Sequence, residues 1–149
     1  TVMAFDPYCP AEAMREAGVE PAADLKALYS GSDFVSIHIP ATAETKGSIG
    51  RELIAAMPKG AVLINTARKE VINEAELEEV LAERPDLKYF ADVRPGNADV
   101  LTERFADRVF FTPKKSGAQT AEANLNAGVA AARQIAAFFA TGCTKFKVN

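Results

Sequence analysis

The chain has 149 residues, of which 48% are hydrophobic and 25% are charged, and its formal net charge is -3. This size and balance suit one globular domain with a sizeable core and argue against intrinsic disorder. A surface for nucleic acid or for an anionic membrane would normally carry a basic excess, so we expect a small-molecule partner instead.

The two cysteines, Cys9 and Cys143, lie near opposite ends of the sequence. They have no metal-ligand spacing and no further thiols beside them, so we expect no metal site and a reducing cytoplasm. The most apolar segment, residues 127–140, is interrupted by Arg133 and Gln134 and is too short to cross a bilayer. The first residues do not have the pattern of a secretory signal.

Five apolar runs of strand length follow one another along the chain. They cover residues 1–5, 33–39, 60–66, 87–93 and 108–112. Such near-continuous runs are typical of strands buried on both faces.

Segments of helical period lie between these runs. We expect helices over residues 11–17, 23–29 and 50–57, and a longer helix that begins at Asn73 and ends before Pro85. Asn73 suits a cap, because its side chain can accept a hydrogen bond from an exposed helical N–H.

The last predicted helix is the longest. Thr120 is its expected cap, and apolar residues step along it by three and four positions to Gly142. Because both of its faces are apolar, we expect it to lie between two layers. The alternation of strands and helices predicts an α/β fold with a doubly wound, Rossmann-like parallel sheet and ligands at the carboxyl ends of the strands.

Polar residues gather where the predicted strands end: Asp6, Tyr8, His38, Thr66, Arg68, Asp92, Lys114 and Ser116. Asp6, followed by Pro7, suits an acid that accepts hydrogen bonds from both hydroxyls of an adenosine ribose. Its charge would repel a 2'-phosphate, which favours NAD over NADP. An ordinary Asp-Pro turn is the alternative reading.

Five sequence motifs identify a resemblance. In order they are AFDPY, SDFVSIHIPATAETKGSIG, MPKGAVLINTARKEVINEAELEEVL, ADVRPGN and FFTPKKSGAQTAEAN. Together they resemble the nucleotide-binding domain of the D-isomer-specific 2-hydroxyacid dehydrogenases over nearly the whole chain. H-x-P-x-T-x-x-T-x-G with N-T-A-R downstream is a highly specific combination. The last motif is similar to a subtype of D-3-phosphoglycerate dehydrogenase in which lysine replaces the catalytic histidine.

The resemblance implies an NAD-dependent enzyme that transfers a hydride between a D-2-hydroxy acid and NAD. It favours 3-phosphoglycerate, the substrate of serine biosynthesis, with Arg68 and Lys114 as catalytic residues. The cofactor-binding residues that it implies are Asp6, Pro7, His38, Pro40, Thr45, Thr66, Ala67, Asp92, Ser116 and Gly117. In relatives the H-x-P histidine lines the cofactor cleft and does not transfer the proton, and a structural histidine is the alternative for His38.

The reaction needs a cation that holds the substrate carboxylate and a group that exchanges a proton at the carbon-2 oxygen. Arg68 suits the first role because a guanidinium binds a carboxylate through two parallel hydrogen bonds, and Lys114 takes the second by its position after T-P. The alternatives are an ordinary surface arginine and a solvated lysine. Lys115 remains open between a contact to a substrate phosphate and plain solvation.

The chain departs from the common family pattern in a second place. Asn97 stands where most relatives carry a glutamate that pairs with the histidine. A carboxylate raises the pKa of a neighbouring base, which helps a histidine but hinders a lysine that starts near a pKa of about 10.4. Our hypothesis is that the loss of the glutamate and the gain of Lys114 are coupled.

In the family the glycine-rich loop precedes the ribose-binding acid by about 20 positions, and here that acid is Asp6. We therefore expect the glycine-rich loop to lie outside these residues. We expect the same of the substrate domain and of the first strand of the sheet order 3-2-1-4-5-6. Residues 1–141 would then be a partial NAD-binding domain and 142–149 a tail that returns towards the substrate domain. A shortened polypeptide, part of a longer chain, or a short protein completed by another subunit would each explain this. By resemblance we also expect a homodimer.

Two rival functions stay open. A glyoxylate or hydroxypyruvate reductase would be expected to keep the histidine and glutamate pair. A non-catalytic dinucleotide-sensing interaction module would have no need of Arg68 and Lys114.

Overall fold

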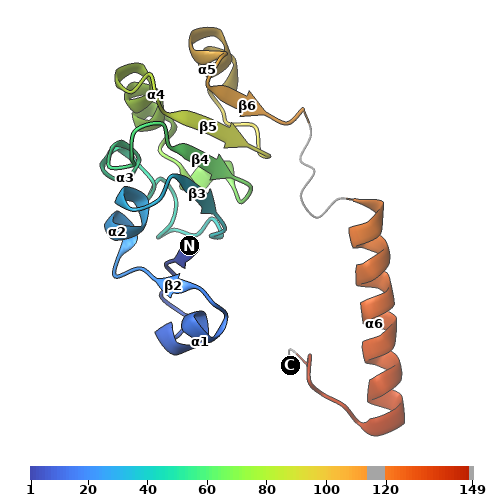
Figure 1. Ribbon diagram of the computed structural model, residues 1–149. Helices are drawn as coiled ribbons and strands as arrows, with labels where there is room; N and C mark the ends of the chain where they lie inside the picture. Colours follow the sequence, from blue (N-terminus) through green and yellow to red (C-terminus); the bar gives the residue numbers. More distant parts are fainter. Residues whose placement is uncertain (114–119, 148–149) are drawn as a thin grey trace. The chain divides into compact units, whose positions relative to one another are not determined.

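The computed structural model describes residues 1–113 and 120–147, and the chain divides into two compact units, Thr1–Lys114 and Lys115–Asn149. The first unit carries the strands and the second carries one long helix (Figure 1). The strands are β1 (Met3–Ala4), β2 (Glu20–Pro21), β3 (Phe34–Ile37), β4 (Val62–Asn65), β5 (Lys88–Ala91) and β6 (Val109–Phe111). The helices are α1 (Ala11–Glu16), α2 (Leu25–Ser30), α3 (Arg51–Ala55), the 3-10 turn η1 (Lys69–Val71), α4 (Glu74–Glu83), α5 (Ala98–Phe105) and α6 (Ala121–Thr141).

All described strand pairs are parallel. β1 pairs with β2, and a second sheet has the order β3-β4-β5-β6, in which Val35, Leu63, Tyr89 and Val109 are neighbours in register. In the predicted order 3-2-1-4-5-6, the first strand, which lies outside these residues, would stand between β1 and β3. The break between the two sheets falls at this place. The fold class, an α/β arrangement with a Rossmann-like parallel sheet, is confirmed.

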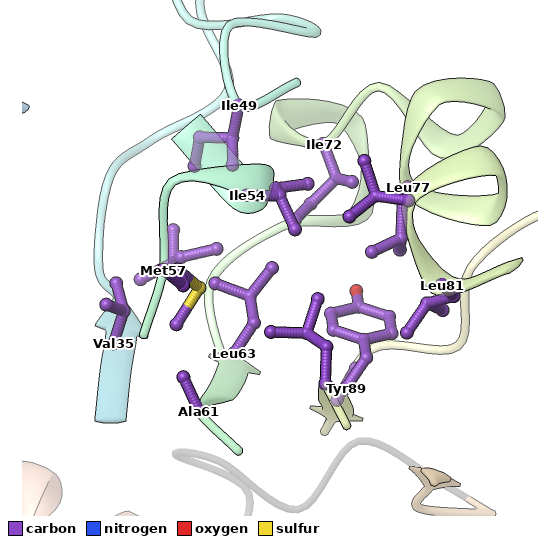
Figure 2. Packing of buried hydrophobic residues seen from close by; sticks show 14 of the residues in the cluster. Val35, Ile49, Ile54, Met57, Ala61, Leu63, Ile72, Leu77, Leu81 and Tyr89 are labelled. Atoms are coloured by element: carbon purple, nitrogen blue, oxygen red, sulfur yellow. The ribbon is translucent and has the colours of Figure 1, made fainter. Parts of the chain in front are cut away.

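The core lies on one face of the four-stranded sheet, beneath helices α2 to α5. Figure 2 shows Ile54, Leu77 and Leu81 of the helices packed against Leu63 and Tyr89 of the strands, and these five side chains are fully buried. Burying such a side chain contributes about 1.5–3 kcal/mol each. This packing fixes the strand ends that carry the candidate site.

Within the first unit the opposite face of the sheet is covered only in part, and burial on both faces stays a prediction. In β3 and β5 exposed and buried residues alternate. On the side away from the core, Phe34 of β3 and Phe110 of β6 are 71% and 60% exposed. Successive side chains of a strand point to opposite faces of the sheet. In β3 and β5 the helices of the first unit therefore cover every second side chain. Phe90 and Phe110 contact each other edge to face on this side, with ring centroids 6.5 Å apart.

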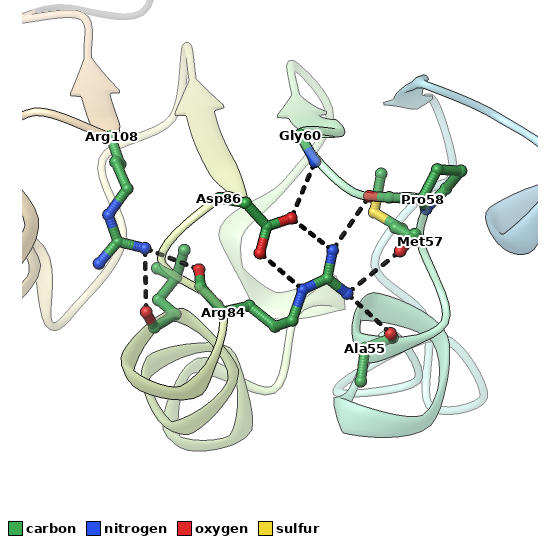
Figure 3. Close-up of polar contacts among 8 residues, drawn as sticks. Ala55, Met57, Pro58, Gly60, Arg84, Asp86 and Arg108 are labelled. Carbon is green, nitrogen blue, oxygen red and sulfur yellow. Dashed lines mark hydrogen bonds and ion pairs between the residues drawn. The ribbon is translucent and has the colours of Figure 1, made fainter.

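Helix α4 begins and ends as predicted. The Asn73 side chain accepts a hydrogen bond from Glu76 N–H at 3.3 Å, and the helix ends at Glu83, ahead of Pro85. The last carbonyls of a helix have no partner within it. Arg108, from the start of β6, donates through Nη1 to the carbonyl oxygens of Leu81 and Arg84 at 3.0 and 2.8 Å (Figure 3).

Arg84 follows α4 and binds the end of α3. Its guanidinium donates to the main-chain oxygens of Ala55, Met57 and Pro58, at 3.0, 3.1 and 3.0 Å (Figure 3). The same guanidinium pairs with Asp86. One side chain therefore ties the end of α3 to the turn that leads into β5.

Helix α6, in the second unit, has the predicted boundaries. Thr120 Oγ1 accepts a hydrogen bond from Ala123 N–H at 3.0 Å. The helix ends at Thr141, and the φ of 69° at the following Gly142 is the left-handed conformation that glycine adopts without strain. Its placement between two layers stays a prediction. Among the described residues, no helix has the length and apolar character that a membrane span requires.

Three elements were not predicted: β2, η1 and α5. β2 consists of two residues, one of them a proline, and η1 is a single turn. α5 has eight residues and buries Ala98, Leu101 and Phe105. β2 and η1 are too short to show a hydrophobic period. The buried residues of α5 do follow a helical spacing, at positions i, i+3 and i+7, and the sequence analysis did not recognise it.

Candidate functional site

The parallel strands β3 to β6 bring their carboxyl ends to one edge of the sheet, as the sequence predicts. His38 follows β3, Arg68 follows β4, and Asp92 follows β5. Asp6 follows β1 in the smaller sheet. The loops at these ends therefore form the candidate site.

Asp6 occupies an exposed turn. Its Oδ1 accepts a hydrogen bond from Tyr8 N–H at 2.9 Å, and its main-chain oxygen accepts one from Cys9 N–H at 3.3 Å. Asp6 thus closes the Asp-Pro turn that the sequence offered as the alternative. Its Oδ2 has no hydrogen-bond partner in the part of the chain that the structure describes. The turn and a role in binding ribose are therefore compatible.

The loop after β3 is held by internal hydrogen bonds. Thr45 Oγ1 donates to Pro40 O at 2.5 Å and accepts from Thr42 N–H at 2.8 Å. Thr45 thereby shapes the loop rather than projecting a free hydroxyl. His38 is exposed, and its Nε2 lies 2.9 Å from Ser36 Oγ, so the ring has a hydrogen-bond partner on its own strand.

Asn65 shapes the loop after β4. It is the last residue of that strand, and its side chain is fully buried. Its Oδ1 accepts a hydrogen bond from Ala67 N–H at 3.0 Å, and its Nδ2 donates to Arg68 O at 2.9 Å. The sequence analysis did not single out Asn65, although the N-T-A-R motif contains it.

Arg68 projects from this loop. Its side chain is exposed, and its Nη1 donates to Ala67 O at 2.8 Å. Within residues 1–113 and 120–147 it forms no ion pair with an acidic side chain. Most of its donors are thus available to an anionic ligand. Thr66, two residues before Arg68, is exposed as well.

Asp92 connects three strands. Its N–H donates to Asn65 O at 3.0 Å, and its Oδ1 accepts a hydrogen bond from Thr112 Oγ1 at 2.9 Å. Thr112 N–H in turn donates to Ala91 O at 3.1 Å. Asp92 is half-buried. The ends of β4, β5 and β6 are therefore joined at Asp92, through its main-chain N–H on one side and its carboxylate on the other.

Asn97 is bound to helix α4. Its Nδ2 donates to Glu74 O at 3.2 Å and to Glu78 Oε2 at 3.4 Å. Its Oδ1 is buried without a hydrogen-bond partner among the described residues. Gly96 N–H donates to Glu74 Oε1 at 2.8 Å, so α4 holds the end of the loop that follows Asp92, at Gly96 and Asn97.

The remaining predicted site residues, Lys114, Ser116 and Gly117, lie outside the described residues, as does Lys115. The described part of the chain contains no group of three or more His, Cys, Asp or Glu side chains that would hold a metal ion. For a dinucleotide the described residues do fit. Asp6 offers an open carboxylate oxygen, Thr66 an exposed hydroxyl and Asp92 an acceptor at the next strand end.

Comparison with known proteins identifies the family. The family model described as "D-isomer specific 2-hydroxyacid dehydrogenase, NAD binding domain" matches residues 1–114. D-3-phosphoglycerate dehydrogenase of Methanocaldococcus jannaschii is 38% identical over 138 residues, which are 90% of this chain and 26% of that protein. Hydroxypyruvate reductase of Thermotoga maritima is 38% identical over 127 residues, which are 82% of this chain and 40% of that protein.

A solved structure gives the same result. The crystal structure of NAD+-bound 3-phosphoglycerate dehydrogenase of Entamoeba histolytica matches with a TM-score of 0.78 and 44% identity, over 97% of this chain and 45% of that chain. The chain thus spans less than half the length of each of these relatives. The predicted family and its cofactor, NAD, are confirmed, and the chain belongs to the NAD binding domain family of the D-isomer specific 2-hydroxyacid dehydrogenases.

Proposed function

We propose that the protein carrying this chain is an NAD-dependent oxidoreductase that oxidises a D-2-hydroxy acid, foremost 3-phosphoglycerate, as the first step of serine biosynthesis. The observation that carries this proposal is the loop after β4, where Asn65 holds the backbone around Arg68 and the guanidinium has no acidic partner among the described residues. A permanently charged, planar cation at a strand end suits the carboxylate of such a substrate. The names of the relatives support the choice of 3-phosphoglycerate.

The chain's own residues divide the remaining tasks. Arg68 binds and orients the carboxylate, and Lys114, as the neutral amine, takes the proton from the hydroxyl at carbon 2 as the hydride leaves that carbon. Bound NAD supplies the hydride acceptor. Asp92 accepts a hydrogen bond from the carboxamide of the nicotinamide, with Ser116 and Gly117 near the same group.

The adenosine side of the cofactor falls to the loops after β1 and β3. Asp6 and Pro7 hold the ribose, while His38, Pro40 and Thr45 line the cleft. The internal hydrogen bonds of Thr45 suit a residue that shapes the wall of a cleft. Thr66 and Ala67 contribute their backbone on the nicotinamide side.

Lys114 needs a lowered pKa to exchange protons near neutral pH. The positive charge of Arg68 and exclusion of water would both lower it. No glutamate follows Asp92 at the position of the family's acid. Asn97, which stands there, uses its amide to bind α4 and brings no negative charge to oppose this shift.

A reductase of glyoxylate or hydroxypyruvate is the second candidate. The similarity to the Thermotoga maritima hydroxypyruvate reductase favours it. A non-catalytic dinucleotide-sensing module is the third, and the pairing of Arg68 with Lys114 argues against it.

We further propose that the protein is a cytoplasmic homodimer that binds neither nucleic acid nor membranes. Both cysteines, Cys9 and Cys143, are free thiols, which suits a reducing compartment. The net charge of -3 gives no support to a polyanionic partner.

The test is an assay of the full-length protein with 3-phosphoglycerate, glycerate and lactate, each with NAD, following the absorbance of the reduced cofactor. We expect the highest kcat/KM with 3-phosphoglycerate. Preference for hydroxypyruvate with NADH in the reverse direction would favour the reductase. Binding of NAD without turnover of any substrate would favour the sensing module.

A further inference from the structure

We propose that Asn65 is a positioning residue, which fixes the backbone from which Arg68 projects. The inference rests on the proposed function, in which Arg68 binds the substrate carboxylate. In this proposal the placement of the Arg68 guanidinium against the carboxylate depends partly on the buried amide of Asn65, which does not itself contact the substrate.

The first argument is burial. Asn65 has an exposed fraction of 0%, and it is the one buried amide or charged side chain among the described residues. An amide removed from water is costly unless its donor and its acceptor are both satisfied. Within the next three residues the Asn65 side-chain oxygen accepts the Ala67 N–H, and one N–H of its amide donates to Arg68 O.

The second argument is the location of these two bonds. Ala67 N–H and Arg68 O belong to the backbone on either side of the Arg68 α-carbon, so the amide of Asn65 fixes the direction in which the side chain leaves the loop. The Arg68 guanidinium also donates to Ala67 O at 2.8 Å. A shift of this backbone would therefore move the guanidinium with it.

The third argument is the link to the neighbouring strand. The main-chain oxygen of Asn65 accepts the Asp92 N–H at 3.0 Å. Asn65 is thus bonded to both loops that carry proposed site residues of the nicotinamide side. Only an asparagine offers a donor and an acceptor in one short planar group, since aspartate lacks the donor and leucine lacks both.

The test compares Asn65→Asp and Asn65→Leu with Leu63→Ala in the full-length protein. Leu63 is also fully buried in β4 but makes no hydrogen bond to the loop, so Leu63→Ala reports loss of core packing alone. We expect the Asn65 variants to lower kcat/KM for 3-phosphoglycerate by about 10- to 100-fold, because small misplacements of a binding group have effects of this size. We expect Leu63→Ala to lower the urea midpoint with little effect on kcat/KM.

A double variant asks whether Asn65 acts through Arg68. In the Arg68→Ala background, Asn65→Leu should cause no further loss of kcat/KM, because the group that it positions is gone. A second measurement, amide hydrogen exchange, needs no activity. The Ala67 N–H should exchange faster in Asn65→Leu than in the wild type. In Leu63→Ala, the exchange rate of the Ala67 N–H relative to that of the Asp92 N–H should stay as in the wild type.

The inference would be overturned if the losses of kcat/KM caused by Arg68→Ala and Asn65→Leu multiplied in the double variant. It would also be overturned if the exchange rate of the Ala67 N–H were the same in Asn65→Leu as in the wild type. Failure of the proposed function has a different signature. In that case Arg68→Ala alone would leave kcat/KM unchanged, although the Ala67 amide still responded to Asn65→Leu.

Discussion

Arg84 and Asp86 form a two-point ion pair at the turn that leads into β5. Arg84 Nε donates to Asp86 Oδ1 at 2.9 Å and Nη2 donates to Oδ2 at 2.6 Å, and the two side chains are 24% and 21% exposed. Asp86 Oδ2 also accepts the Gly60 N–H at 2.8 Å. Because Arg84 binds three carbonyls at the end of α3 as well, the pair joins that helix, the start of β4 and the start of β5.

Removing the guanidinium should destabilise the fold. We expect Arg84→Met to lower the free energy of unfolding by about 2 kcal/mol, because hydrogen bonds to a charged group contribute about 1.5–3 kcal/mol when they are shielded from water. Urea denaturation measures this. Arg94→Met is the matched control, since its pair with Asp99 is 52% and 96% exposed and should contribute below about 1 kcal/mol. Equal losses in the two variants would contradict the assignment.

The same pair predicts a pH dependence. The hydrogen bond from Arg84, and then that from Gly60 N–H, lowers the pKa of Asp86 well below its ordinary value of 3.8. A carboxyl with a depressed pKa in the folded state stabilises the protein above its unfolded pKa, and this contribution fades as the pH falls from about 4 towards the folded pKa. Asp86→Asn should therefore be less stable than the wild type at pH 7.

The difference between Asp86→Asn and the wild type should shrink as the pH is lowered below about 4. Free energies of unfolding measured by urea denaturation at several pH values check this. Asp99→Asn serves as the exposed control and should show no comparable trend. A difference that stays constant down to low pH would mean that Asp86 is not held ionised by Arg84.

Asp6 should govern the choice of cofactor. Its carboxylate has one open oxygen, so we expect Asp6→Ser to raise the KM for NAD by about tenfold or more, the size of a lost hydrogen bond to a charged group. Removing the charge should also lower the KM for NADP, because the repulsion of the 2'-phosphate is gone. Steady-state kinetics with both cofactors measure the ratio. Glu12→Gln, on the nearby exposed helix α1, controls for a change of surface charge alone.

The fold was largely predictable because long apolar runs and capping residues act locally. The spacing of Asn73 and Glu76 placed the start of α4, and Thr120 and Gly142 placed both ends of α6. What the sequence could not show depends on contacts between distant segments. Exposure of Phe34 depends on which helices cover the sheet, and a run of apolar letters does not reveal this.

The candidate site was predicted only as a set of strand ends. Asn65 escaped notice because an amide at the end of a strand looks like any polar residue that begins a loop, and its importance follows from burial and from two bonds to the backbone. Asn97 was considered only as a replacement for a glutamate. Its bonds to α4 arise from the packing of two segments more than 15 residues apart along the chain.

The coupling of Lys114 with Asn97 gives a further prediction. We expect Lys114→His alone to be weakly active, and Lys114→His with Asn97→Glu to recover turnover with a higher apparent pKa, because a carboxylate favours the imidazolium form. The pH dependence of kcat/KM for 3-phosphoglycerate measures both. Asn97→Glu alone should reduce stability, since a new carboxylate would lie beside Glu78. If the single histidine variant performs as well as the double, the coupling is wrong.

The clamp formed by Arg84 has a consequence for how this sequence can drift. Its guanidinium binds peptide oxygens, so replacing the side chains of Ala55 or Met57 leaves its hydrogen bonds intact. Many side chains should therefore be tolerated at the exposed Ala55, whereas Met57 is constrained separately by its burial in the core. Arg84 and Asp86 should tolerate little change, because each also binds the main chain of another segment.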